Sequence, residues 1–263
     1  MRYSVITINY NNRDGLLYTI ESVVCQNYSD FEYIIIDGGS TDGSVDIIKK
    51  FEHQITYWCS EPDGGIFNAM NKGTNHASGE YLIFMNSGDC FHSKNVLSSI
   101  GEHQEDIICG KILRGDSKKP TGHNRDAITL IDLIRDTLPH QAMFIKKELL
   151  LKFPYDEKYK IHADWKFCLE AIIIGNCTFC NINQIIANYN LDGISANSNG
   201  QLHRERKAIL KELFPPRIIA DYQRVAIVDD ELLDQAVTLT QTVKARKLVK
   251  IISNFVLRIV NKK

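Results

Sequence analysis

The sequence has no surplus of charge of either sign. Its 31 Lys and Arg residues nearly balance 32 Asp and Glu residues, which leaves a formal net charge of -1 at pH 7. A basic excess over the whole molecule would favour nucleic acid as a partner, and a strong acidic excess would favour basic partners. We therefore expect no nucleic-acid partner, and any charged function must come from a local cluster.

The sequence also lacks a long hydrophobic run at its amino end. Residues 1–12 contain one Arg and a short apolar stretch that ends in Asn-Tyr-Asn-Asn, which is neither the apolar core of a signal peptide nor a membrane span. We therefore expect a cytoplasmic protein. The motifs GxGxxG, GxxxxGK(S/T) and GxSxG are absent, which disfavours dinucleotide binding, P-loop chemistry and α/β-hydrolase chemistry.

Cysteine usage argues against a disulfide framework. Seven cysteines are an odd number, and their spacing is not that of a small disulfide-rich protein, so a reducing compartment is expected. One Cys-x-x-Cys pair, Cys177 and Cys180, has no second pair nearby. A zinc or redox role is open to it, but two ordinary strand cysteines are the better interpretation.

Strand and helix patterns alternate along residues 1–189. Apolar, β-branched or aromatic runs predict strands at 4–9, 31–36, 55–60, 81–85, 107–112, 139–145 and 179–189. Helical spacing between the first strands predicts helices at 15–25, 45–51 and 66–77. Such alternation is typical of a parallel sheet with right-handed crossovers. We therefore predict an α/β fold, a Rossmann-like, mostly parallel sheet flanked by helices.

The character of the sequence changes near residue 200. From Gln201 onward it is charged and helix-forming, so we place a boundary there. A chain of 263 residues is long enough for one large α/β domain with an appendage. The predicted organisation is a main domain over 1–200 and a helical C-terminal extension over 201–263.

The stretch Tyr81–Asp89 is the centre of the predicted fold. Five apolar residues without alternation indicate a strand that is buried on both faces. Asn-Ser-Gly-Asp follows, at the carboxyl end where ligands collect in open α/β sheets. The alternative is an ordinary strand-to-helix turn with Asp89 as a helix cap.

Three more polar clusters follow predicted strands, at residues 9–12, 37–44 and 63–65. Because the carboxyl ends of neighbouring parallel strands lie side by side, we expect all four clusters to share one crevice. Turn chemistry explains each cluster alone, but four in corresponding positions favour a binding site.

These segments resemble the ordered signature of family 2 glycosyltransferases with the GT-A fold. The resemblance runs from about Met1 to Tyr189 and rests on VITINYNN (5–12), YIIIDGGSTDGS (33–44), EPDGGIFNAMNKG (61–73) and GEYLIFMNSGD (79–89). It implies an inverting hexosyltransferase that moves a sugar from a nucleoside diphosphate sugar to a saccharide or lipid-linked saccharide acceptor. It also implies assistance by Mg²⁺ or Mn²⁺ and a place in bacterial cell-surface polysaccharide biosynthesis.

The resemblance assigns roles to individual residues. Asp37 matches the acid that binds the nucleobase, Asp89 lies in the metal-binding motif, and Asp164 in His-Ala-Asp-Trp matches the catalytic base. The residues implied for nucleotide-sugar binding are Thr7, Asn9, Asn11, Asp37, Gly39, Ser40, Asp63, Gly65, Asn71, Asn86, Ser87, His140 and Gln141.

Two positions depart from the family pattern. Residues 37–40 read Asp-Gly-Gly-Ser instead of Asp-Asp-Gly-Ser, so one carboxylate that would meet the nucleobase is missing. Residues 86–89 read Asn-Ser-Gly-Asp instead of Asp-x-Asp-Asp, so Gly88 replaces the acid that binds the metal in many relatives. Mg²⁺ keeps several waters and needs one or two carboxylates besides substrate phosphates, so Asp89 alone remains workable.

The implied reaction explains the residue types. Displacement at an anomeric carbon needs a base for the acceptor hydroxyl and a positive centre for the departing diphosphate. Asp164 is the candidate base, with helix capping as the alternative. His140 and Gln141 are candidates to bind donor phosphate or acceptor hydroxyl. For His162, a catalytic role and a role in packing are both open.

The last twenty residues, 244–263, contain no acidic residue. Apolar residues form one helical stripe (Leu248, Ile251, Ile252, Phe255 and Ile259), and Lys247, Lys250 and Arg258 lie on another. This basic amphipathic pattern favours peripheral contact with the inner face of the cell membrane, where a lipid-linked acceptor would lie. Packing on the main domain or on a second subunit is the alternative.

Two other functions compete with the transferase. The thinned acidic motif suits a non-catalytic nucleotide-sugar-binding or scaffold protein. A nucleotidyltransferase is disfavoured because the first strand is not followed by a Gly-rich phosphate loop with Arg or Lys.

Overall fold

A computed structural model describes residues 1–125, 127–190, 200–225, 246–247 and 250–252. The chain divides into two compact units, Met1–Phe214 and Pro215–Lys263. All the residues predicted to bind sugar nucleotide or metal lie in the first unit.

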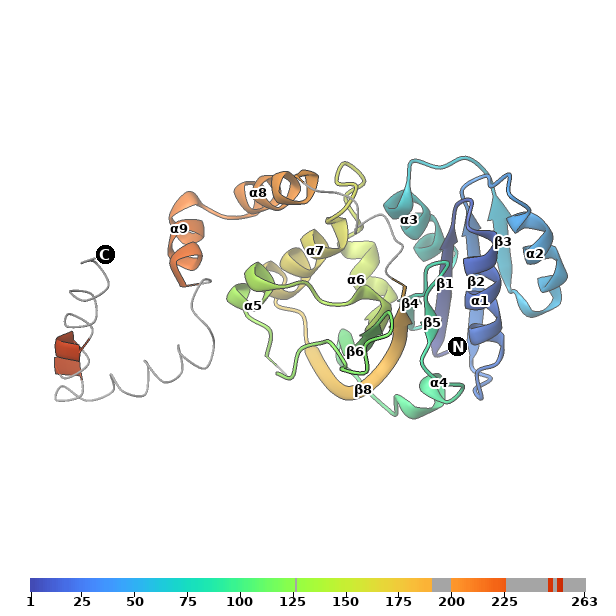
Figure 1. Ribbon diagram of the computed structural model, residues 1–263, viewed down its shortest axis with the longest axis horizontal. Coiled ribbons are helices and arrows are strands. Elements are labelled where there is room, and N and C mark those ends of the chain that lie inside the picture. The colour runs from blue at the N-terminus through green and yellow to red at the C-terminus, as the bar shows by residue number, and fades with distance from the viewer. Residues whose placement is uncertain (126, 191–199, 226–245, 248–249, 253–263) are drawn as a thin grey trace. The chain divides into compact units, whose positions relative to one another are not determined.

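The first unit begins with four parallel strands joined by helices (Figure 1). The strands are β1 (Tyr3–Asn9), β2 (Phe31–Asp37), β3 (Tyr57–Ser60) and β4 (Tyr81–Phe84), and the helices are α1 (Arg13–Val24), α2 (Ser44–Lys50) and α3 (Ile66–His76). Strand β1 pairs with both β2 and β4, so the chain moves outward to β3 and then returns to the other side of β1. Such a reversal of strand order opens a crevice at the carboxyl ends of the strands.

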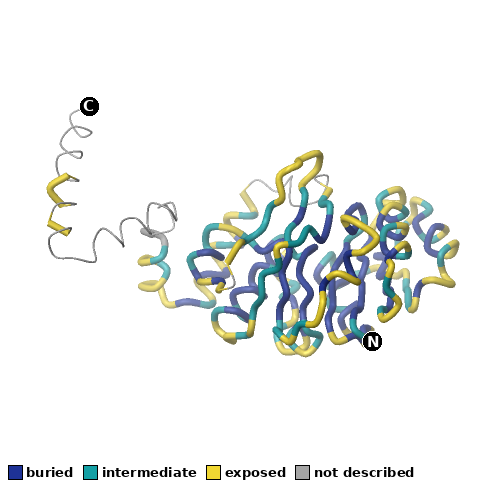
Figure 2. The backbone as a smooth tube through the Cα atoms, turned by 90° about the horizontal axis from the view of Figure 1, so that it is seen from below, coloured by how far each residue is buried: buried dark blue, intermediate teal, exposed yellow. Residues whose placement is uncertain are grey.

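Helices cover both faces of these strands, which explains their continuous apolar runs. Successive side chains of a strand point to opposite faces. Val5 and Ile35 pack in one core with apolar residues of α1 and α2. Ile6 and Ile36 face Gly73 of α3, where an added Cβ would lie 2.5 Å from Ile6 Cγ2. Strands β1, β2 and β4 are accordingly buried along almost their whole length, like the centre of the molecule in Figure 2, whereas the edge strand β3 is only partly buried.

The second half of the sheet contains an antiparallel strand. Strand β7 (Met143–Lys146) runs antiparallel to both β4 and β6 (Ile107–Arg114), and β6 pairs in parallel with β8 (Phe179–Tyr189). A two-residue strand, β5 (Cys90–Phe91), completes the eight-stranded order β3-β2-β1-β4-β7-β6-β8-β5. The predicted α/β fold with a mostly parallel sheet is confirmed. The differences from the prediction are the antiparallel direction of β7 and the short strand β5, which pairs antiparallel with β8.

Short helices and turns connect the strands of the sheet. They are α4 (Val96–Ser99), α5 (Leu130–Arg135), α6 (Lys147–Lys152), α7 (Ala163–Cys168) with its π-helical continuation Leu169–Ile174, and the 3₁₀ turns Glu52–Gln54 and His140–Ala142. The turn His140–Ala142 and the start of α7 carry the predicted residues of the second half.

Helix α8 (Gln201–Leu213) belongs to the first unit, although the predicted boundary lies near residue 200. It buries Ile209 and Leu210. Glu212 forms ion pairs with Lys158 and Lys166 of the preceding segment. Part of the charged composition that predicted a separate extension therefore comes from side chains, such as Glu212, that pair with the rest of the first unit. Helix α9 (Pro216–Val225) opens the second unit.

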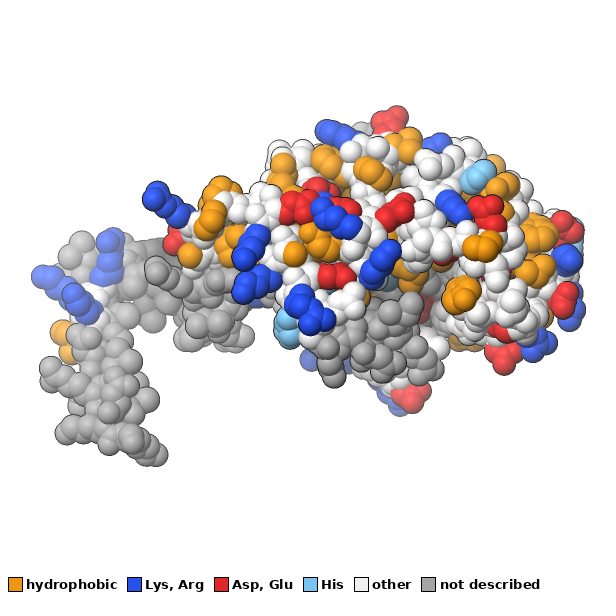
Figure 3. Space-filling view, turned by 90° about the horizontal axis from the view of Figure 1, so that it is seen from above, with side chains coloured by type: hydrophobic (Ala, Val, Ile, Leu, Met, Phe, Trp, Pro, Cys, Tyr) orange, Lys and Arg blue, Asp and Glu red, His pale blue; other side chains and the backbone are white. Residues whose placement is uncertain are grey.

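Acidic and basic side chains are interspersed over the face in Figure 3, without a large patch of one sign. Within the described residues, no helix combines the length and apolar character that a membrane span requires.

Candidate active site

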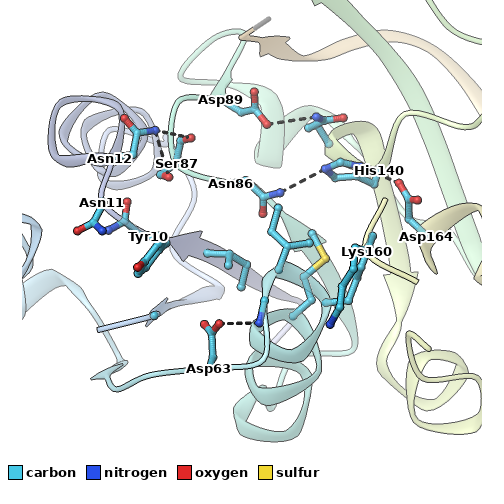
Figure 4. Close-up of a pocket in the computed structure, with 18 of the residues that line it drawn as sticks. Tyr10, Asn11, Asn12, Asp63, Asn86, Ser87, Asp89, His140, Lys160 and Asp164 are labelled. Carbon is cyan, nitrogen blue, oxygen red and sulfur yellow. Dashed lines mark hydrogen bonds and ion pairs between the residues drawn. The ribbon is translucent and has the colours of Figure 1, made fainter. Parts of the chain in front are cut away.

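A pocket of about 770 Å³ lies at the carboxyl ends of β1 and β4 (Figure 4). Each of the four polar clusters contributes to its lining, as the strand order predicts. Ten predicted site residues line it: Asn9, Asn11, Asp63, Gly65, Asn86, Ser87, Asp89, His140, Gln141 and Asp164.

Five predicted site residues lie outside the lining: Thr7, Asp37, Gly39, Ser40 and Asn71. Thr7 is in the core, where its Oγ1 lies 2.9 Å from the Tyr33 hydroxyl. Asn71 donates to the carbonyl of Tyr155 at 2.8 Å and to Glu157 at 2.9 Å. Both side chains therefore hold the scaffold of the pocket.

Asp37 is fully buried and its oxygens are saturated. Oδ1 accepts from Asn9 Nδ2 at 2.7 Å and from Ser40 Oγ at 2.6 Å. Oδ2 accepts from the Ser40 N–H at 2.9 Å and from Ser60 Oγ at 2.6 Å. A carboxylate has about four acceptor positions, so this one has none left for a ligand. In this structure Asp37 fixes the turn that presents Gly38.

Tyr10, Gly38 and Asp63 lie next to one another in the lining of the pocket, and we call the part of the pocket beside them the slot. A Cβ on Gly38 would lie 2.9 Å from Asp63 Oδ2 and 3.1 Å from Tyr10 Cδ2, so only glycine leaves both side chains in place. The Tyr10 ring is 67% exposed. The sequence did not single out Tyr10, because an exposed aromatic residue in a loop has no periodic pattern.

The turn after β4 is tied to the start of α1. Asn12 Nδ2 donates to the carbonyl of Ser87 at 3.0 Å, and the Gly88 N–H donates to Thr19 Oγ1 at 3.0 Å. Gly88 has a φ of 103°, in the left-handed region that favours glycine. An acid at this position would be strained, so the departure from the family pattern matches the local backbone.

Asp89 is only 5% exposed. Its Oδ1 accepts from the Asn190 N–H at 3.0 Å and its Oδ2 from Gln141 Nε2 at 3.2 Å. Burial raises the pKa of this carboxyl to about 6, although the two hydrogen bonds and the nearby His140 oppose the rise. Among the described residues, no Lys or Arg forms an ion pair with it.

His140 links the two halves of the site. Its Nδ1 lies 3.2 Å from Asp164 Oδ2, and its Nε2 lies 3.4 Å from Asn86 Nδ2. Burial lowers the pKa of the imidazole, but the hydrogen bond and charge of Asp164, with the charge of Asp89, outweigh it and the net pKa is raised. The contact with a carboxylate requires a proton on Nδ1. His140 therefore donates to Asp164 and holds its carboxylate in place.

Lys160 is a cation in the pocket lining that the sequence did not indicate. Its Nζ donates to the carbonyl of Gly64 at 3.0 Å, across from the start of α3. Figure 4 shows Tyr10 and Asp63 on one side of the pocket and Lys160, His140 and Asp164 on the other. A single Lys in a loop forms no recognisable sequence motif.

The family resemblance implies a divalent cation, and the residues near Asp89 fit one. The Oδ1 atom of Asn86 is buried without a hydrogen-bond partner. The buried Asp89 carboxylate forms no ion pair with a Lys or Arg among the described side chains, and His140 is the one basic side chain that acts on its pKa. A buried carboxylate and an orphaned amide oxygen are hard ligands of the kind that Mg²⁺ and Mn²⁺ take. The described group with metal-ligand spacing, His103, Glu105 and Cys180, lies outside the pocket lining.

Comparison with known proteins gives one family. The sequence model described as glycosyl transferase family 2 matches residues 4–172. An uncharacterized glycosyltransferase of Mycobacterium tuberculosis is 34% identical over 226 residues, which cover 80% of each chain. A PGL/p-HBAD biosynthesis glycosyltransferase of Mycobacterium bovis is 28% identical over 207 residues, or 74% of this chain and 79% of that one.

Solved structures agree in fold. TarS 1–349 of S. aureus in complex with UDP-GlcNAc has a TM-score of 0.66 at 20% identity, over 81% of this chain and 66% of that chain. The mannosyltransferase PcManGT of Pyrobaculum calidifontis, in complex with GDP-Man and Mn²⁺, has a TM-score of 0.56 at 15% identity, over 97% of this chain and 80% of that chain. With the family match covering most of the first unit, the chain belongs to glycosyltransferase family 2.

Proposed function

We propose that this glycosyltransferase transfers a sugar from a nucleoside diphosphate sugar to a saccharide or lipid-linked saccharide acceptor, with inversion at the anomeric carbon. The observation that supports the proposal is that one pocket is lined by two carboxylates, Asp164 beside His140 and the buried Asp89. The M. bovis relative acts in PGL biosynthesis by its name, which supports a role in building cell-surface glycans.

Asp164 is the proposed general base. Its carboxylate is 18% exposed and lines the pocket, and His140 fixes its direction through Oδ2. The acceptor hydroxyl would lose its proton to Asp164 as its oxygen bonds to the anomeric carbon. The bond between that carbon and the diphosphate oxygen breaks on the opposite face, which gives inversion.

The slot at Tyr10 is the proposed nucleobase site. A planar base can stack on the exposed Tyr10 ring, and the close approach of the Gly38 backbone suits a flat ligand. Asn9 Oδ1 is buried without a partner, and Asp63 adds a carboxylate, so both offer acceptors to base N–H groups and ribose hydroxyls. In this proposal Asp63 takes the role that the resemblance gave to Asp37.

The diphosphate would lie between the nucleobase slot and Asp164, next to residues 86–89. Asp89 and Asn86 would hold Mg²⁺ or Mn²⁺, which would supply positive charge to the departing diphosphate. PcManGT, the mannosyltransferase with a similar fold, was solved with GDP-Man and Mn²⁺, which supports this assignment.

A donor screen tests the proposal. Calorimetry with UDP-, GDP- and dTDP-sugars, with and without Mg²⁺ or Mn²⁺, should identify one donor whose binding requires the pocket. Release of the nucleoside diphosphate in the presence of acceptor then separates a transferase from a non-catalytic nucleotide-sugar-binding protein. The second function is the alternative because Gly88 stands where many relatives have a metal-binding acid. Tight donor binding without release under any metal or acceptor condition would favour the binding protein.

The basic tail is the proposed contact with a membrane that carries the acceptor. Most of residues 244–263 lie outside the described residues, but Ile251 and Ile252 of the predicted apolar stripe are described and are 66% and 53% exposed. Exposed apolar side chains beside basic residues favour an interfacial site on anionic lipid.

Truncation after Thr242 is expected to move the protein from anionic liposomes into the soluble fraction. The deletion removes seven basic residues together with the apolar stripe. Each basic residue near an anionic surface contributes ~1 kcal/mol. Co-sedimentation at low salt measures the effect, with neutral liposomes as the control. Absence of liposome binding by the full chain would identify the stripe as a packing face.

A further inference from the structure

Helix α8 forms hydrogen bonds with residues 160–162, the segment just before the proposed base Asp164. This helix begins at Gln201, beyond the residues 4–172 that the family model matches. Glu205 on its buried face is 9% exposed and points at the chain just before α7. Its Oε1 accepts from the Lys160 N–H at 3.0 Å, and its Oε2 accepts from the N–H groups of Ile161 and His162 at 3.0 and 3.1 Å.

The Glu205 carboxylate supplies acceptors to backbone N–H groups that would otherwise lack them. Three successive backbone N–H groups point the same way, and no side chain of their own segment satisfies them. Burial works against the charged form of Glu205, but hydrogen bonds from Gln201 and from the three amides outweigh it and lower its pKa. The group therefore stays ionised at neutral pH, and its contact with the amides is charge-assisted.

The segment that Glu205 holds presents side chains to the pocket on both sides. At its start, Lys160 reaches the carbonyl of Gly64 at 3.0 Å. Two residues after its end, Asp164 accepts from His140 at 3.2 Å. Any shift of the segment moves the cation and the carboxylate together.

The residue next to Glu205 fixes the other side of Asp164. Arg206 lies over the Trp165 ring at 4.6 Å from its centroid and donates to the carbonyl of Ile134 at 2.8 Å. The indole N–H of Trp165 donates to the carbonyl of Leu133 at 2.7 Å. Asp164 therefore lies between a segment held by residue 205 and a side chain covered by residue 206.

We infer that Glu205 is a positioning residue for sugar transfer, which sets the place of Lys160 and Asp164 without touching substrate. This inference rests on the proposed function for its catalytic readout. A misplacement of about 1 Å at a reacting group can cost roughly a hundredfold in rate. The loss should appear in kcat, because the nucleobase slot at Tyr10 and Gly38 belongs to other elements.

Glu205→Gln tests the inference, since the amide keeps the volume but loses the charge and one acceptor. We expect kcat for transfer to fall by about tenfold to a hundredfold while the donor Kd, measured by calorimetry with the donor found in the screen, stays unchanged. Glu205→Asp, which keeps the charge but is one methylene too short to reach all three amides, should also lower kcat. It is the variant to measure if Glu205→Gln fails to fold.

Glu212→Gln is the matched control on the same helix. It removes the charge and one acceptor from the contacts with Lys158, Tyr159 and Lys166, which dock α8 but do not involve the amides of residues 160–162. We expect it to lower Tm without changing kcat. If Glu212→Gln loses as much kcat as Glu205→Gln, or if Glu205→Gln keeps the wild-type kcat, the positioning role is wrong.

Hydrogen exchange separates this inference from the proposed function. The amides of residues 160–162 should exchange faster in Glu205→Gln than in the wild type and should be unchanged in Glu212→Gln. This readout needs no substrate, so it decides the structural claim even if no donor supports transfer. Equal exchange in both variants would overturn it, whereas an inactive wild type would overturn only the proposed function.

Discussion

Asp164→Asn is expected to transfer sugar at least ~100-fold more slowly than the wild type while binding donor with the same affinity. The amide keeps the shape of the side chain and can still accept the Trp165 N–H, which lies 2.8 Å from Oδ1 in the wild type. It cannot take the proton of the acceptor hydroxyl. Single-turnover transfer at saturating donor, with calorimetry for donor affinity, measures the difference.

The alternative role of Asp164 is structural, and the two roles predict effects of different size on the transfer rate. Loss of a helix-capping contact costs about 1 kcal/mol of stability and leaves turnover of the folded protein nearly unchanged. Transfer within a fewfold of the wild-type rate would therefore exclude Asp164 as the base. His140 would be the next residue to test, because it lines the pocket, whereas His162 is buried outside the lining.

Asp89→Asn is expected to abolish the stimulation of turnover by Mg²⁺ or Mn²⁺ and to leave the fold intact. The neutral amide keeps the volume but removes the charge that attracts the cation. Rates with and without metal, and metal titration by calorimetry, measure the effect. Full stimulation by metal in this variant would remove Asp89 from the site.

In the absence of metal, Asp89→Asn is also expected to change how the stability of the protein depends on pH. Burial raises the pKa of Asp89 to about 6, above the ~3.9 of an unfolded Asp. The folded state therefore binds the extra proton between about pH 4 and pH 6, and the stability contributed by this group falls as pH rises through that window. At higher pH the buried charge costs at most about 3 kcal/mol. Urea unfolding in EDTA should show this pH dependence in the wild type and its loss in Asp89→Asn.

The polar clusters at the strand ends could be predicted from the sequence. The change from apolar to polar residues marks where each strand ends, and the order of the strands indicates which ends lie together. Apolar runs that stop at small polar residues marked the ends of β1, β2 and β4, and the order of strands brought these ends to one pocket. The direction of β7 could not be predicted, because residues 139–145 have the same apolar pattern in either direction. Strand β5 has two residues and is too short for any pattern.

The roles of single side chains were harder to predict than their neighbourhood. Asp37 matches a family position, yet its oxygens are used by Asn9, Ser40 and Ser60, and no sequence pattern reports which acceptors a turn consumes. Lys160 lines the pocket from a segment whose backbone Glu205 holds, and Glu205 lies 45 residues later in the chain. Such long-range contacts have no local signal.

The fit between Gly38 and Asp63 makes the two positions epistatic. A side chain at residue 38 would collide with Asp63 Oδ2 at 2.9 Å, and Asp63 is itself held by the Gly65 N–H at 2.8 Å. A lineage with an acid at position 38 would therefore have to displace the carboxylate at position 63 before, or together with, that change. Restoring the family's second Asp alone would therefore displace the Asp63 carboxylate, so that the β2 loop rather than the β3 loop would present an acid at this slot.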